Sequence, residues 1–224
     1  MIVYMFDSSN LSKIAYENIL KLITSGEIKL GSQVSQNALS RKLPMSRTPV
    51  REALFALESQ GLLEKNGTKY YVSYISKQDV VKLYEVRKIL EGGSAKACAM
   101  NLDDAGRKRL ENIVKRLKTL SESDSATPDQ ITFENGNLHQ TIAELSGNTY
   151  IYKYIMETLL KLRLVRMSLL ISLERRVEEY RDHKQIVDHI LNGDGEKARI
   201  AMEMHEDAVL EFAQKTVFKK FYVD

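Results

Sequence analysis

Residues that interrupt regular structure are scarce in this chain. Its 224 residues include only 11 glycines and three prolines. These two residue types occupy most tight turns and helix breaks, so a chain with few of them has little room for linkers or for many turns. The sequence therefore favours long helices with short connections.

The composition is that of a soluble globular protein. Hydrophobic residues make up 43% of the chain and charged residues 28%, which is typical of a chain that buries a core. No apolar run approaches the roughly 18 residues of a membrane span, and residues 1–30 lack the apolar centre of a signal peptide. The single cysteine, Cys98, excludes a disulfide within the chain. These features predict a cytoplasmic protein with no membrane partner.

The first 76 residues are predicted to form a winged helix-turn-helix domain. Apolar residues recur at helical spacing in three segments, with breaks at Pro44 and Gly61. The spacing then changes to that of two short strands around the turn signal Asn66-Gly67. The predicted helices span residues 11–23, 36–43 and 46–61, and the predicted strands 62–64 and 70–74.

Residues 77–224 are predicted to form a second, all-helical domain. Helical spacing continues almost throughout, with junctions at Gly147-Asn148 and Gly193-Asp194. The fold class is therefore mainly α, with a winged domain at 1–76 and a bundle of about six helices at 77–224. The six predicted helices span residues 77–100, 104–121, 129–146, 148–172, 176–192 and 194–215.

The excess positive charge lies entirely in the first domain. Residues 1–76 hold nine Lys/Arg and six Asp/Glu, and the rest of the chain holds 24 of each. A polyanion would therefore dock on the first domain.

Two arginines are the best candidates for contacting such a polyanion. Arg47 and Arg51 are four residues apart and share the face opposite the apolar stripe of the third predicted helix. Arginine can donate two hydrogen bonds to guanine in the major groove, while the hydroxyls of Ser46 and Thr48 can hold phosphates. The alternative is that both arginines are ordinary solvated surface charges.

The residues around this pair resemble the N-terminal signature of GntR-family bacterial transcription regulators. The resemblance rests on SRTPVREAL at 46–54, LESQGLL at 57–63 and SGEIKLGS at 25–32. It implies that Arg47 and Arg51 enter the major groove of double-stranded DNA.

The same resemblance assigns two further DNA contacts. The wing tip, Asn66-Gly67, would approach the minor groove. Relatives often carry an arginine early in the second helix, where this chain has Asn37, so a weaker or differently specified contact is expected there.

Three of the four histidines fall on apolar helix faces. His139, His183 and His205 lie on three different predicted helices, which suggests that they converge inside the bundle. Buried imidazoles need hydrogen bonds or a metal. The alternative is that each is a separately hydrogen-bonded core histidine.

Residues 78–210 resemble the FCD ligand-binding domain of the FadR-like branch of the GntR family. The resemblance rests on four motifs: YEVRKILE at 84–91, NGNLH at 135–139, HKQI at 183–186 and MEMH at 202–205.

This resemblance implies a divalent metal site. Many family members bind the ion through one aspartate and three histidines at these places, which here are Asn135, His139, His183 and His205. An amide oxygen can ligate but carries no charge, so metal affinity is expected to be lower; zinc or nickel is favoured. A third possibility is that the site holds no metal and the histidines bind the effector directly.

A small organic acid is the expected effector. Arg87 is the first candidate for binding its carboxylate, through paired hydrogen bonds. The alternative is that Arg87 pairs with Glu91, four residues later. Arg163 and Arg166 are second-rank candidates.

The sequence thus predicts a regulator, in which a homodimer binds a pseudo-palindromic operator and the acid releases repression. The rival interpretation is a metal-dependent enzyme on a helical bundle, with the winged domain as an interaction module. No nucleophile elbow, phosphate-binding glycine loop or general base beside the histidines is present in the sequence, so enzymatic activity is not expected.

Overall fold

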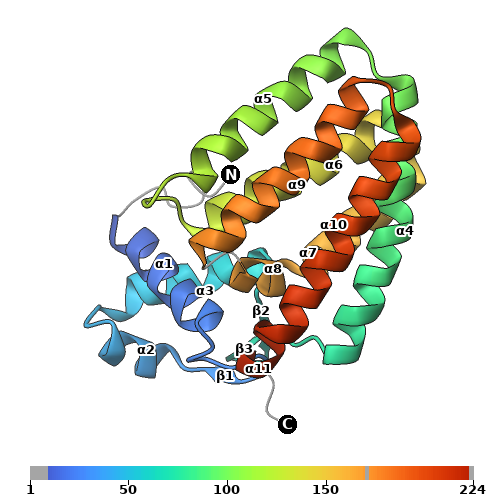
Figure 1. Cartoon of the computed structure of the whole chain (residues 1–224). Coiled ribbons are helices and arrows are strands. Elements are labelled where there is room, and N and C mark those ends of the chain that lie inside the picture. Colours follow the sequence, from blue (N-terminus) through green and yellow to red (C-terminus); the bar gives the residue numbers. More distant parts are fainter. Residues whose placement is uncertain (1–9, 170–171, 222–224) are drawn as a thin grey trace. The chain divides into compact units, whose positions relative to one another are not determined.

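The computed structural model describes residues 10–169 and 172–221 (Figure 1). The chain divides into two compact units. The first comprises the chain up to Ser76 together with the residues from Phe218, and the second comprises Lys77–Val217. The second domain was predicted to run to residue 224, whereas the structure groups the residues after Val217 with the first unit. None of the described helices combines the length and the apolarity that a membrane span requires.

The first unit is a winged helix-turn-helix, as predicted. Its sheet has the strand order β1-β3-β2, with both pairs antiparallel. The strand β1 was not predicted, because it has only two residues and forms by pairing with a distant segment, Gln33 opposite Tyr71. The elements are α1 (Asn10–Thr24), β1 (Gln33–Val34), α2 (Gln36–Lys42), α3 (Arg47–Ser59), β2 (Leu63–Asn66) and β3 (Lys69–Val72).

The helix α3 is held in place by its apolar face. Val50, Ala53, Leu54 and Leu57 are all completely buried, at the spacing of a stripe that packs against a core. Because this stripe faces inward, the opposite side of α3 is presented to solvent.

The second unit is all-helical. One predicted helix, 148–172, is two helices in the structure, α7 and α8, which are separated at Leu162. Leu162 leaves the helical conformation with ψ near 1°, yet its side chain is fully buried; packing therefore selects this break, and neither glycine nor proline marks it in the sequence. Positions 170–171 of that predicted helix lie outside the described residues. The helices are α4 (Lys77–Asn101), α5 (Asp104–Ser121), α6 (Pro128–Leu145), α7 (Thr149–Lys161), α8 (Arg163–Leu169), α9 (Leu173–Leu191) and α10 (Gly195–Lys215), and α11 (Val217–Phe221) follows.

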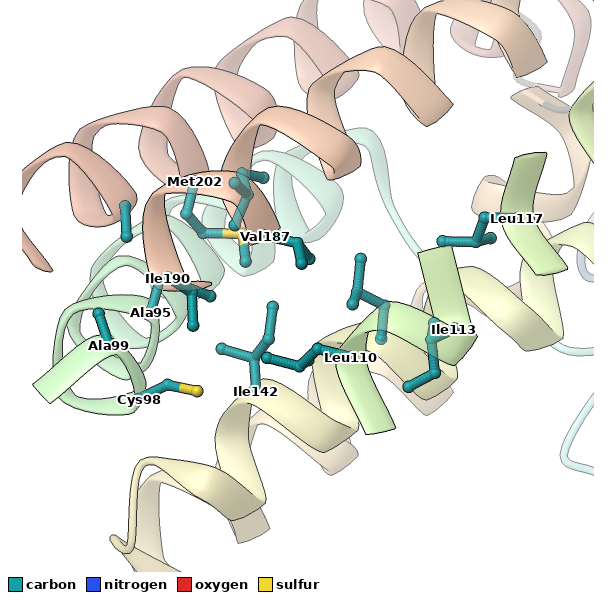
Figure 2. Packing of buried hydrophobic residues seen from close by; sticks show 13 residues of the cluster. Ala95, Cys98, Ala99, Leu110, Ile113, Leu117, Ile142, Val187, Ile190 and Met202 are labelled. Carbon is teal, nitrogen blue, oxygen red and sulfur yellow. The ribbon is translucent and has the colours of Figure 1, made fainter. Parts of the chain in front are cut away.

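The core of the second unit is formed by α4, α5, α6, α9 and α10 (Figure 2). Figure 1 shows α10 lying beside α4 and α9, in agreement with their extensive packing. The stripes that supply this core continue into the predicted histidines. His139 is one turn before Ile142 on α6, and Met202 is one turn before His205 on α10. The polar site is therefore an extension of the apolar core. The residues of the apolar core are Ala95, Cys98, Ala99, Leu110, Ile113, Leu117, Leu138, Ile142, Ile186, Val187, Ile190, Ala198 and Met202.

Candidate functional site

The predicted DNA-contacting residues all lie on the surface of the first unit. Arg47 and Arg51 are exposed on α3, and neither forms an ion pair within the described part of the chain. Their guanidinium groups are therefore available to an external acceptor. Ser46 and Thr48, beside them, are also exposed.

The first turn of α3 has no capping side chain. Ser46 occupies the N-cap position, but its hydroxyl makes no capping hydrogen bond. The first N–H groups of a helix have no acceptor within the helix, and Pro49 has no N–H, so the N–H groups of Arg47 and Thr48 have no acceptor within α3. Such a helix end, with its partial positive charge, suits a phosphate. The side chain of Gln36 at the start of α2 donates to the backbone oxygen of Arg47 at 2.8 Å, which ties the two helix ends together.

The wing is a tight hairpin. Asn66 pairs with Lys69, and Gly67 has a φ of 60° at the first loop position, a conformation that favours glycine. Asn66, Gly67 and, on α2, Asn37 are all exposed.

The structure brings the three predicted histidines together inside the second unit. His139 on α6, His183 on α9 and His205 on α10 each place one ring nitrogen within 4.8 Å of the others. The Nε2 atoms of His139 and His183 are 3.2 Å apart. All three side chains are buried.

Burial favours the neutral form of all three imidazoles. Burial lowers the pKa of His183 and of His205 well below the ordinary 6.5, and neighbouring histidines lower it further. Burial also lowers the pKa of His139, against the opposing effect of Glu91. A neutral imidazole carries one unprotonated nitrogen, which is the form that binds a metal or accepts a hydrogen bond.

Two of the histidines have a carboxylate at Nδ1. Glu91 on α4 contacts His139 Nδ1 very closely, and Asp182 Oδ2 lies 3.3 Å from His205 Nδ1. A proton held at Nδ1 leaves the Nε2 lone pair free, as is common for metal-binding histidines. In contrast, His183 Nδ1 has no hydrogen-bond partner in the described structure.

Arg87 lies behind His139 in a buried charge cluster. Its Nε donates to Glu91 at 2.6 Å, and its Nη2 is 2.8 Å from Glu206. Burial alone would raise the pKa of Glu91, but Arg87 and His139 outweigh burial and hold that pKa below its ordinary value. Burial raises the pKa of Glu206, although Arg87 acts against it. The Arg87–Glu91 pair is the arrangement that the sequence left open as the alternative to effector binding.

Asn135 is also buried at the site. It is one turn before His139 on α6, and its Nδ2 donates to Glu179 on α9 at 2.6 Å. Both side chains are less than a tenth exposed. Burial raises the pKa of Glu179, against the opposing effect of Arg175.

The two second-rank arginines have different surroundings. Arg163 is half-buried and pairs with Asp129 at 3.0 Å. On α6, Asp129 lies about 15 Å from His139, at the helical rise of about 1.5 Å per residue. Arg166 is only 7% exposed, and its side chain makes no hydrogen bond or ion pair with any described residue. Its Nη1 lies over Gly136, 3.7 Å from where a Cβ would be. Burial, and then the charge of Arg87, lowers the pKa of Arg166.

Apart from Glu91, sequence reasoning missed the acidic members of the site. Glu206 was hidden because it directly follows His205, and Glu179 because it is an ordinary residue of a charged helix. One signal was present for Glu179: it precedes His183 by four residues, just as Asn135 precedes His139.

Comparisons with known proteins match both units. The model of the bacterial regulatory proteins of the gntR family matches residues 11–69, and the FCD domain model matches residues 82–208. The chain is 29% identical over 222 residues to the HTH-type transcriptional regulator LutR of Bacillus subtilis, covering 88% of this chain and 100% of LutR. It is 27% identical over 184 residues to the gluconate operon transcriptional repressor of Bacillus subtilis, covering 79% of this chain and 71% of that protein.

A solved structure agrees in fold. E. coli McbR/YncC superposes with a TM-score of 0.65 at 19% identity, over 94% of this chain and 100% of that one. This likeness extends through both units, from the winged domain to the helical one.

Proposed function

Since this chain belongs to the GntR family of bacterial regulatory proteins and carries the FCD domain, we propose that it is a repressor controlled by a small organic acid. Family membership makes it a DNA-binding transcription regulator and not an enzyme. The gluconate operon relative is named as a repressor, which supports the proposal that this protein also represses transcription.

DNA reading is assigned to α3. Arg47 and Arg51 reach guanine edges in the major groove, while the N-terminus of α3 and Ser46 bind phosphate. Asn66 and Gly67 lie at the minor groove. A homodimer presents two such helices to the halves of a pseudo-palindromic operator.

Effector binding is assigned to Arg166. Its side chain is 7% exposed and makes no hydrogen bond or ion pair with a described residue, and this carries the proposal, because a carboxylate could neutralise the guanidinium with two hydrogen bonds. The buried Tyr84 hydroxyl, which also lacks a partner among the described residues, can donate to the same ligand. Arg87 has two acidic partners and is therefore assigned a structural role.

The three-histidine site fits a divalent cation. Imidazole nitrogens that bind one zinc ion at about 2.1 Å are about 3.4 Å apart in a tetrahedral site, close to the 3.2 Å between His139 and His183. His139, His183 and His205 would hold the ion, with Asn135 as an oxygen donor. When bound, the ion would attract the carboxylate of the effector.

Control of operator binding requires that the acid bind two forms of the protein with different affinities. An effector lowers operator affinity only if it prefers the arrangement of the winged domains that fits the operator poorly.

The test combines DNA selection with an acid panel. DNA selected from a random library by the wild-type protein is titrated by fluorescence anisotropy, with and without monocarboxylates, dicarboxylates and sugar acids including gluconate. We expect one acid to weaken binding at least tenfold in the wild type. Arg166→Leu should bind the DNA normally and lose this response; an equal response in Arg166→Leu would contradict the assignment.

A further inference from the structure

The ligands proposed for the cation carry no negative charge. Three of them are the imidazoles of His139, His183 and His205, and the fourth is the amide of Asn135. A divalent ion moved from water into a buried site loses its hydration, at a cost that neutral ligands offset only in part. Negative charge must therefore lie close to these ligands.

Glu179 is placed to supply it through Asn135. The Asn135 amide nitrogen donates to Glu179 Oε2 at 2.6 Å, and the two side chains are 3% and 6% exposed. The positions also match: Asn135 is one turn before His139 on α6, and Glu179 is one turn before His183 on α9, so each lies on the face of its helix that carries a histidine.

Arg175 forms a longer ion pair with Glu179. Its Nη2 is 3.6 Å from Glu179, beyond hydrogen-bond distance, while its Nη1 lies 3.2 Å from the exposed Glu178. The short contact of Glu179 is the one with Asn135.

We infer that Asn135 and Glu179 act as one unit, in which Asn135 supplies the ligand oxygen and Glu179 supplies the negative charge. With its nitrogen committed to Glu179, the amide is fixed in orientation, and the carboxylate draws electron density toward the amide oxygen Oδ1. Glu179 is thus a positioning residue for the cation and not a direct ligand.

The same arrangement recurs around the site. Glu91 lies behind His139, and Asp182 lies behind His205. Three of the four proposed ligands therefore have a carboxylate in contact with them.

This inference rests on the proposed cation site, and a metal titration tests it. The full-length protein, freed of metal, is titrated with Zn²⁺ in competition with a chromogenic chelator. Glu179→Gln should bind Zn²⁺ roughly 10- to 100-fold more weakly than the wild type. The matched control, Glu178→Gln, removes the neighbouring carboxylate and should leave the affinity unchanged.

A double variant separates the effect of charge on Zn²⁺ affinity from the effect of a changed structure. In Asn135→Asp/Glu179→Gln the carboxylate and the amide exchange places, so the hydrogen bond and the total charge are kept. We expect Zn²⁺ affinity to return to the wild-type level or above it.

Three outcomes would overturn the inference. Wild-type affinity in Glu179→Gln, or failure of the double variant to recover, would show that the charge of Glu179 is not used, while the cation site itself would stand. Absence of Zn²⁺ binding by the wild type would overturn the cation site together with this inference.

Discussion

The Nε2 atoms of His139 and His183 face each other at 3.2 Å, although the two residues lie on different helices and 44 positions apart. Both rings are buried, and burial lowers the pKa of each. Two lone pairs at this distance repel each other, so either a proton or a cation must lie between or beside them. In the proposed site, a divalent cation occupies this position.

Protein purified without chelator or nickel resin should contain about one divalent metal ion per chain by elemental analysis. Because a ligand that binds only the folded state stabilises it by about 2.7 kcal/mol at 100 times its Kd, EDTA should lower the melting temperature by several degrees. His183→Ala should abolish both effects. His189→Ala, which changes a half-buried histidine outside the cluster, is the control and should leave them intact. Metal-free protein with a melting temperature insensitive to EDTA would show that the histidines serve another purpose.

Replacing Arg87 and replacing Arg166 should have different consequences for stability. Arg87→Leu leaves Glu91 and Glu206 buried without their cation, which should lower the free energy of unfolding by about 3–5 kcal/mol. Arg166→Leu removes a guanidinium that has no partner among the described residues, so stability without effector should be unchanged or slightly raised. Urea unfolding measures both variants. A large loss of stability in Arg166→Leu would show that Arg166 is structural.

The Cys98 thiol should be inert in the native protein. Burial raises its pKa from 9.0 to about 12, so folding favours the protonated form. This stabilisation is fully present below about pH 9 and is lost as the pH rises toward 12, at up to about 1.4 kcal/mol per pH unit. Iodoacetamide at about pH 8 should modify Cys98 only in concentrated urea, and Cys98→Ala should remove this part of the alkaline loss of stability. Rapid modification of the native protein would contradict the burial of Cys98.

The sequence was sufficient for features that depend on local spacing. The apolar stripe of α3, the wing turn at Gly67 and most helix bounds follow from periodicity and turn residues, and the Arg87–Glu91 pair follows from their separation of four residues. The sequence was not sufficient for features that depend on packing between distant segments. The two-residue strand β1 forms only by pairing with β3, the break at Leu162 carries no glycine or proline, and the partner of Arg163 is Asp129, 34 positions earlier. Likewise, no local pattern shows that Glu179 contacts Asn135 across two helices.

Operator affinity tests the central claim most directly, because DNA reading is assigned to two exposed side chains. Fluorescence anisotropy with the selected DNA should show that Arg51→Ala weakens binding roughly 5- to 150-fold, equivalent to about 1–3 kcal/mol, and relaxes the preference at one base pair of each half-site. Arg181→Ala makes the same chemical change on the exposed surface of α9 and should bind like the wild type. Wild-type affinity and sequence preference in Arg51→Ala would contradict the assignment of DNA reading to α3.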